Sequence, residues 1–236
     1  MIKPVRIFRE FLYPSGIKCI VCDAELSKDT RYGVCPNCKL PYNENYCTVC
    51  GRAVPVQNIV CDTCKNVVSP FESARSSFIY GDASATLVHK LKYRNARYLA
   101  SVMSEFMADT YFSTEWSIDE VTCVPIHRNR FRQRGYNQSE LLAREVAARI
   151  KKNFAITLEK TVKTKNMVKL NRNERMELIR GSFAAKSGAE IRGKKLLLVD
   201  DVLTTGATAG ECARVLCANG AESVCVLTFA SVAAKY

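Results

Sequence analysis

The sequence contains no uninterrupted apolar run of the ~18 residues that a membrane-spanning helix needs, so we expect no membrane span. Its first residues are basic, but no apolar core with a small-residue cleavage site follows them. We therefore expect no secretory signal and a cytoplasmic protein.

Two common nucleotide-binding patterns are also missing. The loop that follows the most apolar segment, 196–199, lacks the glycine pattern of a dinucleotide-binding turn. It also lacks the lysine of a P-loop, which disfavours an ATPase. A Rossmann-like turn with chance threonines is the alternative interpretation of this loop, and the missing glycines weaken it.

Length and charge leave a broad range of functions open. A chain of 236 residues with 47% hydrophobic content can form one large domain or two modest ones. The net charge is +12, from 35 basic and 23 acidic residues, and it favours an anionic partner such as a phosphate ester or a nucleic acid. Many solvated surfaces are basic as well, so charge alone does not choose the partner.

The 12 cysteines are unevenly placed along the chain. Eight of them form four CxxC pairs: Cys19 and Cys22, Cys35 and Cys38, Cys47 and Cys50, Cys61 and Cys64. Without a secretory signal, paired cysteines indicate metal rather than disulfides, and two CxxC turns complete one tetrahedral zinc site. We expect two structural zinc ions held by consecutive pairs. An interleaved pairing stays open, and an iron–sulfur cluster is the alternative metal group.

The remaining cysteines stand singly among apolar residues and are expected to be small buried hydrophobes. They are Cys123, Cys212, Cys217 and Cys225. The segment that holds the pairs is poor in large apolar residues, so metal must supply much of its stability. We place a domain boundary at Val67-Val68-Ser69-Pro70, which gives a zinc-binding module over 1–69 and a second domain over 70–236.

The second domain has an α/β pattern, typical of a parallel sheet flanked by helices. Strands are expected over 71–80, 121–124, 155–159, 196–199 and 223–229. Helices are expected over 83–93, over 98–110, from Asn137 onward, and after the small-residue loop at 204–208. The cations at the end of the first helix (His89, Lys90, Lys92, Arg94 and Arg97) either complement its C-terminus or form an anion-binding rim.

The segment KLLLVDDVLTTGAT has the strongest functional pattern in the chain. A buried strand ends in Asp200 and Asp201, and small residues then lead into a helix N-terminus. Free N–H groups at such a terminus bind phosphate. The two carboxylates suit a ribose diol or a magnesium ion better than a phosphate. The residues expected to hold the phosphate are Thr204, Thr205, Gly206, Ala207 and Thr208.

A second loop contains a run of arginines. HRNRFRQRG follows the strand at 121–124 and precedes the helix that starts near Asn137. Loops that leave neighbouring parallel strands meet at one edge of the sheet, and arginine offers bidentate contacts to phosphate oxygens. We expect Arg128, Arg132 and Arg134 to bind a pyrophosphate group. A solvated arginine run is the alternative.

These motifs resemble known families. VDDVLTTGAT is similar to the 5-phosphoribosyl-1-pyrophosphate (PRPP) motif of type I phosphoribosyltransferases, in which the acidic pair contacts the ribose and the next loop holds the 5-phosphate. The CxxC pairs, HKLKYRNARYLA, VPIHRNRFRQRGYNQSELLA and LLLVDDVLTTGAT together resemble the ComF family over nearly the whole chain. The resemblance implies a type I phosphoribosyltransferase-like fold, an N-terminal double zinc ribbon, and binding of PRPP with magnesium.

The resemblance further implies a bacterial cytoplasmic protein connected with DNA uptake in natural transformation, with single-stranded DNA and a DNA-uptake helicase as partners. The family is often labelled an amidophosphoribosyltransferase, an activity that a phosphate-binding loop does not establish. No glutaminase is expected, because the cysteines of the first segment are assigned to zinc. In the family, a segment in the place of 161–183 closes over the substrate and excludes water.

Two functions therefore stay open. In the first, the protein is a phosphoribosyltransferase with an unknown acceptor, working through positioning and electrostatics, and no catalytic residue is assigned. In the second, it is a non-catalytic competence factor that binds single-stranded DNA with the same fold. Basic side chains would then contact the DNA backbone, and Phe131, Tyr136 and Tyr93 would stack on bases.

Overall fold

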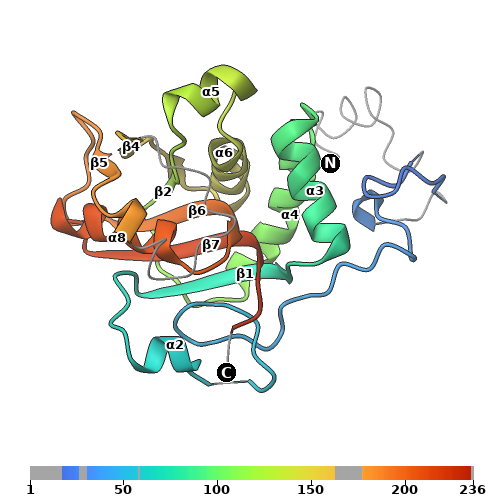
Figure 1. Cartoon of the computed structure of the whole chain (residues 1–236), viewed down its shortest axis with the longest axis horizontal. Helices are drawn as coiled ribbons and strands as arrows, with labels where there is room; N and C mark the ends of the chain where they lie inside the picture. Colours follow the sequence, from blue (N-terminus) through green and yellow to red (C-terminus); the bar gives the residue numbers. More distant parts are fainter. Residues whose placement is uncertain (1–17, 27–30, 58, 163–176, 235–236) are drawn as a thin grey trace.

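A five-stranded parallel sheet forms the core of the protein, for which a computed structural model describes residues 18–26, 31–57, 59–162 and 177–234 (Figure 1). The strand order is β1-β7-β6-β2-β3. The strands are β1 (Ser73–Ile79), β2 (Glu120–Cys123), β3 (Asn153–Phe154), β6 (Lys195–Leu203) and β7 (Ser223–Ser231). Since β6 and β2 are parallel neighbours, the segments that follow them leave the same edge of the sheet.

Helices cover both faces of the sheet, because alternate residues of a strand point to opposite sides. In β6, Leu197 and Val199 pack with α3 (Asp82–Tyr93), α4 (Leu99–Phe112) and α6 (Gln138–Ile150). Leu196 and Leu198 instead pack with α8 (Ala207–Ala218). A two-stranded antiparallel ladder of β4 (Leu158–Lys160) and β5 (Phe183–Ala185) lies beside α8. The expected α/β class is confirmed.

Three sequence expectations need correction. The strand expected at 155–159 is replaced by β3 and β4, which belong to different sheets. The strand expected to end at residue 199 continues as β6 to Leu203, because the acidic pair and the next two residues keep extended backbone. The arginine run is not a loop but a short helix, α5 (Arg128–Arg134), which ends at Gly135 with a left-handed φ of 79°.

The second pair of CxxC turns packs against the outer edge of β1. Asn43 N donates to Ser77 O at 3.0 Å, and Ala74 N donates to Val49 O at 2.9 Å. Near the C-terminal end, Ala234 N donates to Ala53 O at 2.8 Å. An edge strand exposes unpaired backbone groups, and here the cysteine-rich segment satisfies several of them.

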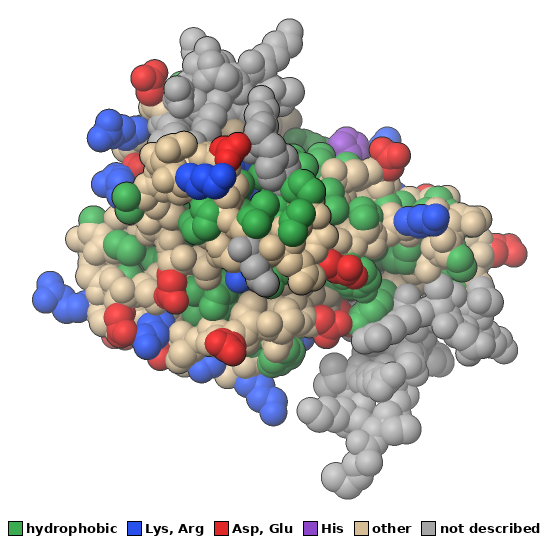
Figure 2. Space-filling view, turned by 90° about the horizontal axis from the view of Figure 1, so that it is seen from below, with side chains coloured by type: hydrophobic (Ala, Val, Ile, Leu, Met, Phe, Trp, Pro, Cys, Tyr) green, Lys and Arg blue, Asp and Glu red, His purple; other side chains and the backbone are tan. Residues whose placement is uncertain are grey.

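The face that holds this segment has a mixed surface. Seen from below, its hydrophobic side chains gather near the middle, and charged side chains are scattered around them (Figure 2). Val56 and Val68 are exposed residues within and just after the segment that holds the second pair of CxxC turns. This segment also contains the short helix α2 (Asp62–Lys65). The basic excess of the chain is therefore not gathered on the described part of this face.

The single cysteines behave mostly as expected. Cys123, Cys212 and Cys225 are buried, whereas Cys217 is exposed near the end of α8, so the expectation for Cys217 is wrong. Within the described ranges, none of the helices combines the length and the apolar character needed to cross a bilayer. The basic segment expected to cover a substrate falls largely at 163–176, which lies outside the described residues.

Candidate functional site

The acidic pair lies near the end of β6, where segments from two other helices meet it. Asp200 Oδ1 accepts a hydrogen bond from Ser139 Oγ at 2.6 Å and another from Asp201 N at 2.9 Å. Ser139 is fully buried in the first turn of α6. Its own N–H is bonded to Asn137 Oδ1 at 3.1 Å, so the cap that starts α6 also fixes the hydroxyl against Asp200.

Lys92, in the last turn of α3, pairs with the other carboxylate. Its Nζ lies 2.6 Å from Asp201 Oδ2. Asp201 is only 3% exposed, and this oxygen makes no well-directed hydrogen bond with the described residues, so the ammonium compensates its charge. The sequence grouped Lys92 with the cations of a helix end, and the structure turns it inward instead.

The environment shifts the protonation of these groups. Burial and the adjacent charge of Asp201 raise the pKa of Asp200 to about 7, although the Ser139 hydrogen bond and Lys92 act in the opposite direction. Burial disfavours the ammonium of Lys92, but the attraction of Asp201 outweighs it and the pKa of Lys92 is raised. Asp200 thus titrates near neutral pH, while Lys92 stays charged.

The predicted phosphate-binding residues follow directly on β6. The chain turns at Gly206, whose left-handed φ of 79° glycine adopts freely, and α8 begins at Ala207. Gly206 has no side chain to cap the first turn. Thr205 Oγ1 lies 3.4 Å from Ala207 N, and Thr204 is exposed at the end of the strand. The structure therefore places a helix N-terminus a few residues beyond the acidic pair.

The three arginines expected to act together lie in two places. Arg128 and Arg132 line a cleft of about 680 Å³ with Phe131 and with Lys160 of β4. Burial, with the nearby positive charge of Arg130, lowers the pKa of Lys160. The cleft therefore brings three basic side chains and the carboxylate of Glu159 together around the ring of Phe131.

Arg134 points to the other side of α5. It donates a hydrogen bond to Gln138 Oε1, and its guanidinium lies 5.2 Å from the centre of the Tyr93 ring. Tyr93 is 65% exposed, but Tyr136 is buried and donates to Leu91 O. The expectation that Tyr136 stacks on bases is therefore wrong, because its ring is part of the packing between α3 and the start of α6.

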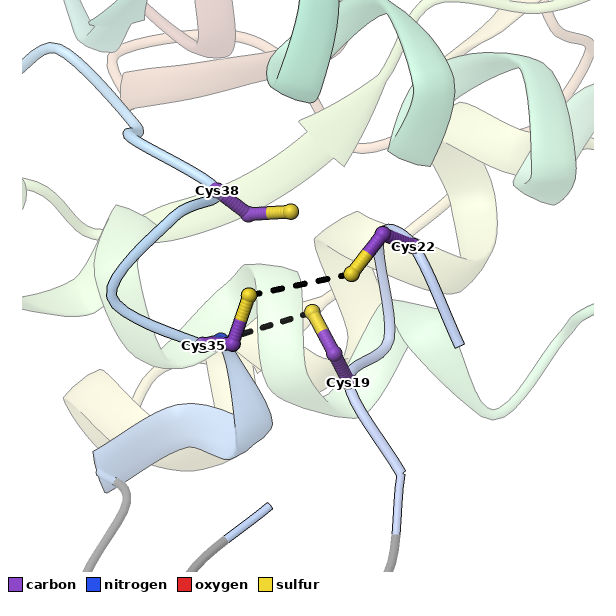
Figure 3. Close-up of side chains that lie close together, drawn as sticks. All are labelled: Cys19, Cys22, Cys35 and Cys38. Atoms are coloured by element: carbon purple, nitrogen blue, oxygen red, sulfur yellow. Dashed lines mark hydrogen bonds between the residues drawn. The ribbon is translucent and has the colours of Figure 1, made fainter. Parts of the chain in front are cut away.

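The eight paired cysteines form two groups of four, and the grouping is sequential. The first holds Cys19, Cys22, Cys35 and Cys38, and the second holds Cys47, Cys50, Cys61 and Cys64. Figure 3 shows the first group, with four sulfur atoms converging from two turns. Within each group the sulfur atoms lie within 4.8 Å of one another. The interleaved arrangement is excluded.

The donor set fits zinc. Four sulfur atoms placed tetrahedrally at ~2.3 Å from a zinc ion are ~3.8 Å apart. Cys22 and Cys35 bring their sulfur atoms to 3.7 Å, and so do Cys50 and Cys61. Arg52 is buried beside the second group, with Nε 3.3 Å from Cys50 Sγ. A cationic neighbour of this kind balances the negative charge that four thiolates leave on a zinc centre.

Two stretches of the chain match known domain families, and several known proteins resemble most of its length. Residues 137–236 match the family described as phosphoribosyl transferase domain, and residues 8–72 match the double zinc ribbon domain. The chain is 24% identical over 216 residues to DNA utilization protein YhgH of Escherichia coli (87% of this chain, 93% of the relative). It is 26% identical over 217 residues to competence protein F of Haemophilus influenzae (89% and 94%). It is 28% identical over 225 residues to competence protein ComFC of Bacillus subtilis (86% and 89%).

The solved structures that resemble this chain have lower sequence identity to it than these relatives and cover less of it. The Bacillus subtilis glutamine PRPP amidotransferase in complex with ADP and GMP gives a TM-score of 0.41 at 18% identity, over 58% of this chain and 30% of that one. Trypanosoma brucei adenine phosphoribosyltransferase gives 0.37 at 16% identity, over 56% and 52%.

The fold, the matched domains and the cysteine groups define a phosphoribosyltransferase-type α/β domain joined to a double zinc ribbon. The resemblance to the ComF family that the motifs predicted is confirmed by relatives that span nearly the whole chain.

Proposed function

We propose that this protein binds PRPP together with magnesium at the end of β6. Asp200 and Asp201 would lie at the ribose, the loop and first turn at 204–208 would hold the 5-phosphate, and arginines of α5 would bind the pyrophosphate, with Arg128 and Arg132 on one side of that helix and Arg134 on the other. The observation that supports this most is the succession of an acidic pair, in which Asp201 is buried and Asp200 is half-buried, and the N-terminus of α8, which Gly206 precedes. Ionised carboxylates accept hydrogen bonds from a diol, and the N-terminus of a helix favours a phosphate.

The chain's own residues contribute binding and orientation. Ser139 and Lys92 hold the two carboxylates in place, which fixes where a ribose would lie. Magnesium, when carried by PRPP, would neutralise part of the pyrophosphate charge. If the protein transfers the phosphoribosyl group, catalysis comes from this positioning and from electrostatic stabilisation of a cation-like sugar. The acceptor and any catalytic residue stay unassigned.

We further propose a cytoplasmic role in DNA uptake, with single-stranded DNA and a DNA-uptake helicase as partners. The support is that two relatives are named competence proteins and others DNA utilization proteins. In this proposal the zinc-binding module spans 1–69 and the phosphoribosyltransferase-like domain spans 70–236.

Calorimetric titration of the zinc-loaded protein with PRPP and magnesium tests the ligand. We expect saturable binding that is lost in the double variant Asp200→Asn/Asp201→Asn. A matched control, Glu190→Gln/Glu222→Gln, also removes two carboxylates; Glu222 there pairs with Lys195, at the opposite end of β6. Absence of binding by folded, zinc-loaded protein would overturn the PRPP assignment.

A second candidate function is supported by the surface around α5. Exposed Phe131 lies beside Arg128 and Arg132, and exposed Tyr93 lies beside Arg134. Aromatic rings next to arginines suit base stacking with contacts to a single-stranded backbone. Fluorescence anisotropy with a labelled single-stranded oligonucleotide over a range of salt tests this.

For Arg128→Gln/Arg132→Gln we expect weaker DNA binding and a shallower salt dependence, by about 0.7 per lost phosphate contact. Lys151→Gln/Lys152→Gln, at the far end of α6, is the matched control. Equal effects of the two double variants would indicate nonspecific attraction by the net charge.

A further inference from the structure

Lys92 is held against the acidic pair by the packing of its own helix. The preceding residue, Leu91, is fully buried in the same core cluster as Leu197 and Val199 of β6. The Leu91 carbonyl also accepts the hydrogen bond of the Tyr136 hydroxyl, at the start of α6. The end of α3 is therefore fixed beside β6, and the ammonium reaches Asp201 from a rigid element.

The other cations near the end of α3 have different surroundings. Arg97 lies over the Tyr136 ring, with its guanidinium carbon 4.6 Å from the ring centre, and its Nε donates to Asn95. Lys90 pairs with Asp23, next to the first cysteine group. Among the described residues, only Lys92 forms an ion pair with Asp201.

This pairing makes the two adjacent carboxylates unequal. Asp201 is buried and faces a full positive charge, whereas Asp200 faces the neutral hydroxyl of Ser139. A buried carboxylate without a partner is costly, and it would repel any anion brought to the start of α8. With Lys92 in place, Asp200 is the carboxylate that stays available to a ribose diol.

We propose that Lys92 is a positioning residue for phosphoribosyl ligands: its ammonium neutralises Asp201, so that a sugar phosphate with several negative charges can bind beside an acidic pair. The inference rests on the proposed PRPP function and assigns different roles to the two aspartates. Asp200 accepts from the ribose hydroxyls, and Asp201 anchors Lys92.

A set of four proteins tests this: the native chain, Lys92→Met, Lys92→Arg, and the double variant Lys92→Met/Asp201→Asn. PRPP with magnesium is titrated into each, and each is melted without ligand. For Lys92→Met we expect PRPP affinity to fall at least about tenfold and the melting temperature to fall by about 10 °C, because a buried carboxylate is left unpaired. Lys92→Arg keeps the charge and should bind within about threefold of the native protein.

The double variant decides the mechanism. If Lys92 acts by neutralising Asp201, removing both charges restores more than half of the lost melting temperature and brings PRPP affinity to within about fivefold of native. A double variant that melts like the native chain but binds no better than Lys92→Met would overturn the proposal, since the ammonium would then contact the ligand itself. Unchanged affinity in Lys92→Met would also overturn it.

A matched control and the native titration separate the possible failures. Lys90→Met removes a cation from the same helix, where its partner Asp23 is exposed, and should leave PRPP affinity unchanged. If the native chain does not bind PRPP, the proposed function fails and this inference fails with it. If the native chain binds PRPP and the double variant shows no recovery, only the inference fails.

Discussion

Ser139 and Asp200 are 61 positions apart in the chain, and a hydrogen bond of 2.6 Å joins them. Ser139 lies in the first turn of α6, the helix that follows β2 and α5, and Asp200 lies near the end of β6, the parallel neighbour of β2. The hydrogen bond therefore joins the helix that follows the arginine segment, which is expected to bind a pyrophosphate, to the strand whose acidic pair is expected to contact the ribose. It also favours the ionised form of Asp200.

Replacing Ser139 with alanine should weaken PRPP binding at pH 7 by about tenfold, because the pKa of Asp200 rises further when this donor is lost. The deficit should shrink at higher pH, where Asp200 is ionised in both proteins. Calorimetric titration at two pH values measures this. Ser104→Ala removes a fully buried hydroxyl from α4, away from the site, and serves as the control. A deficit that is the same at both pH values would contradict the prediction.

PRPP affinity should rise with pH through about 7. Asp200 has its pKa raised to about 7, so it is protonated below that pH and ionised above it. Only the ionised carboxylate accepts hydrogen bonds from both ribose hydroxyls, so binding strengthens on the alkaline side. Affinities measured from pH 6 to 8.5 test the sign. Asp200→Asn, titrated in parallel, reports the pH dependence that comes from the ligand's own phosphate ionisation. A rise in affinity of equal size in that variant would contradict the assignment to Asp200.

Loss of the second cysteine group should destabilise the protein more than loss of the first. Cys61 is 1% exposed, beside the buried Arg52, in a segment hydrogen-bonded to the edge of β1, whereas Cys22 is exposed. We expect Cys61→Ser to melt at least about 5 °C below Cys22→Ser. Metal analysis should show one zinc lost in each variant. Equal melting temperatures of the two variants would mean that the second cysteine group does not stabilise the protein more than the first.

Gly51→Ala should be strongly destabilising. Gly51 has a left-handed φ of +67°, and a Cβ there would lie 2.3 Å from the carbonyl oxygen of Ala74 in β1. We expect a loss on the order of 3 kcal/mol in the free energy of unfolding, measured with urea. Gly188→Ala is the control, because its φ is also left-handed, at +76°, but its Cβ would meet nothing within 4 Å. That variant should lose about 1 kcal/mol from backbone strain alone, and similar losses in the two would contradict a close approach at Gly51.

Local patterns predicted much of the fold. Apolar spacing predicts α3, α4 and α6 to within a few residues, since that spacing determines which face of a helix is buried. The arginine run was harder to assign, because α5 is short and none of its residues is buried. Without an apolar face, periodicity cannot distinguish a helix from a loop.

The amino-acid sequence specifies the cysteine pairs and the order of strand, acidic pair and small-residue turn, because CxxC turns and a strand–turn–helix succession are local in the chain. It did not determine which CxxC turns combine, where Tyr136 points, or which cation faces Asp201. The tertiary structure decided these points, because each depends on two segments far apart in the chain meeting at one place. Burial then makes a charge such as that of Asp201 need the single partner that the fold supplies, Lys92.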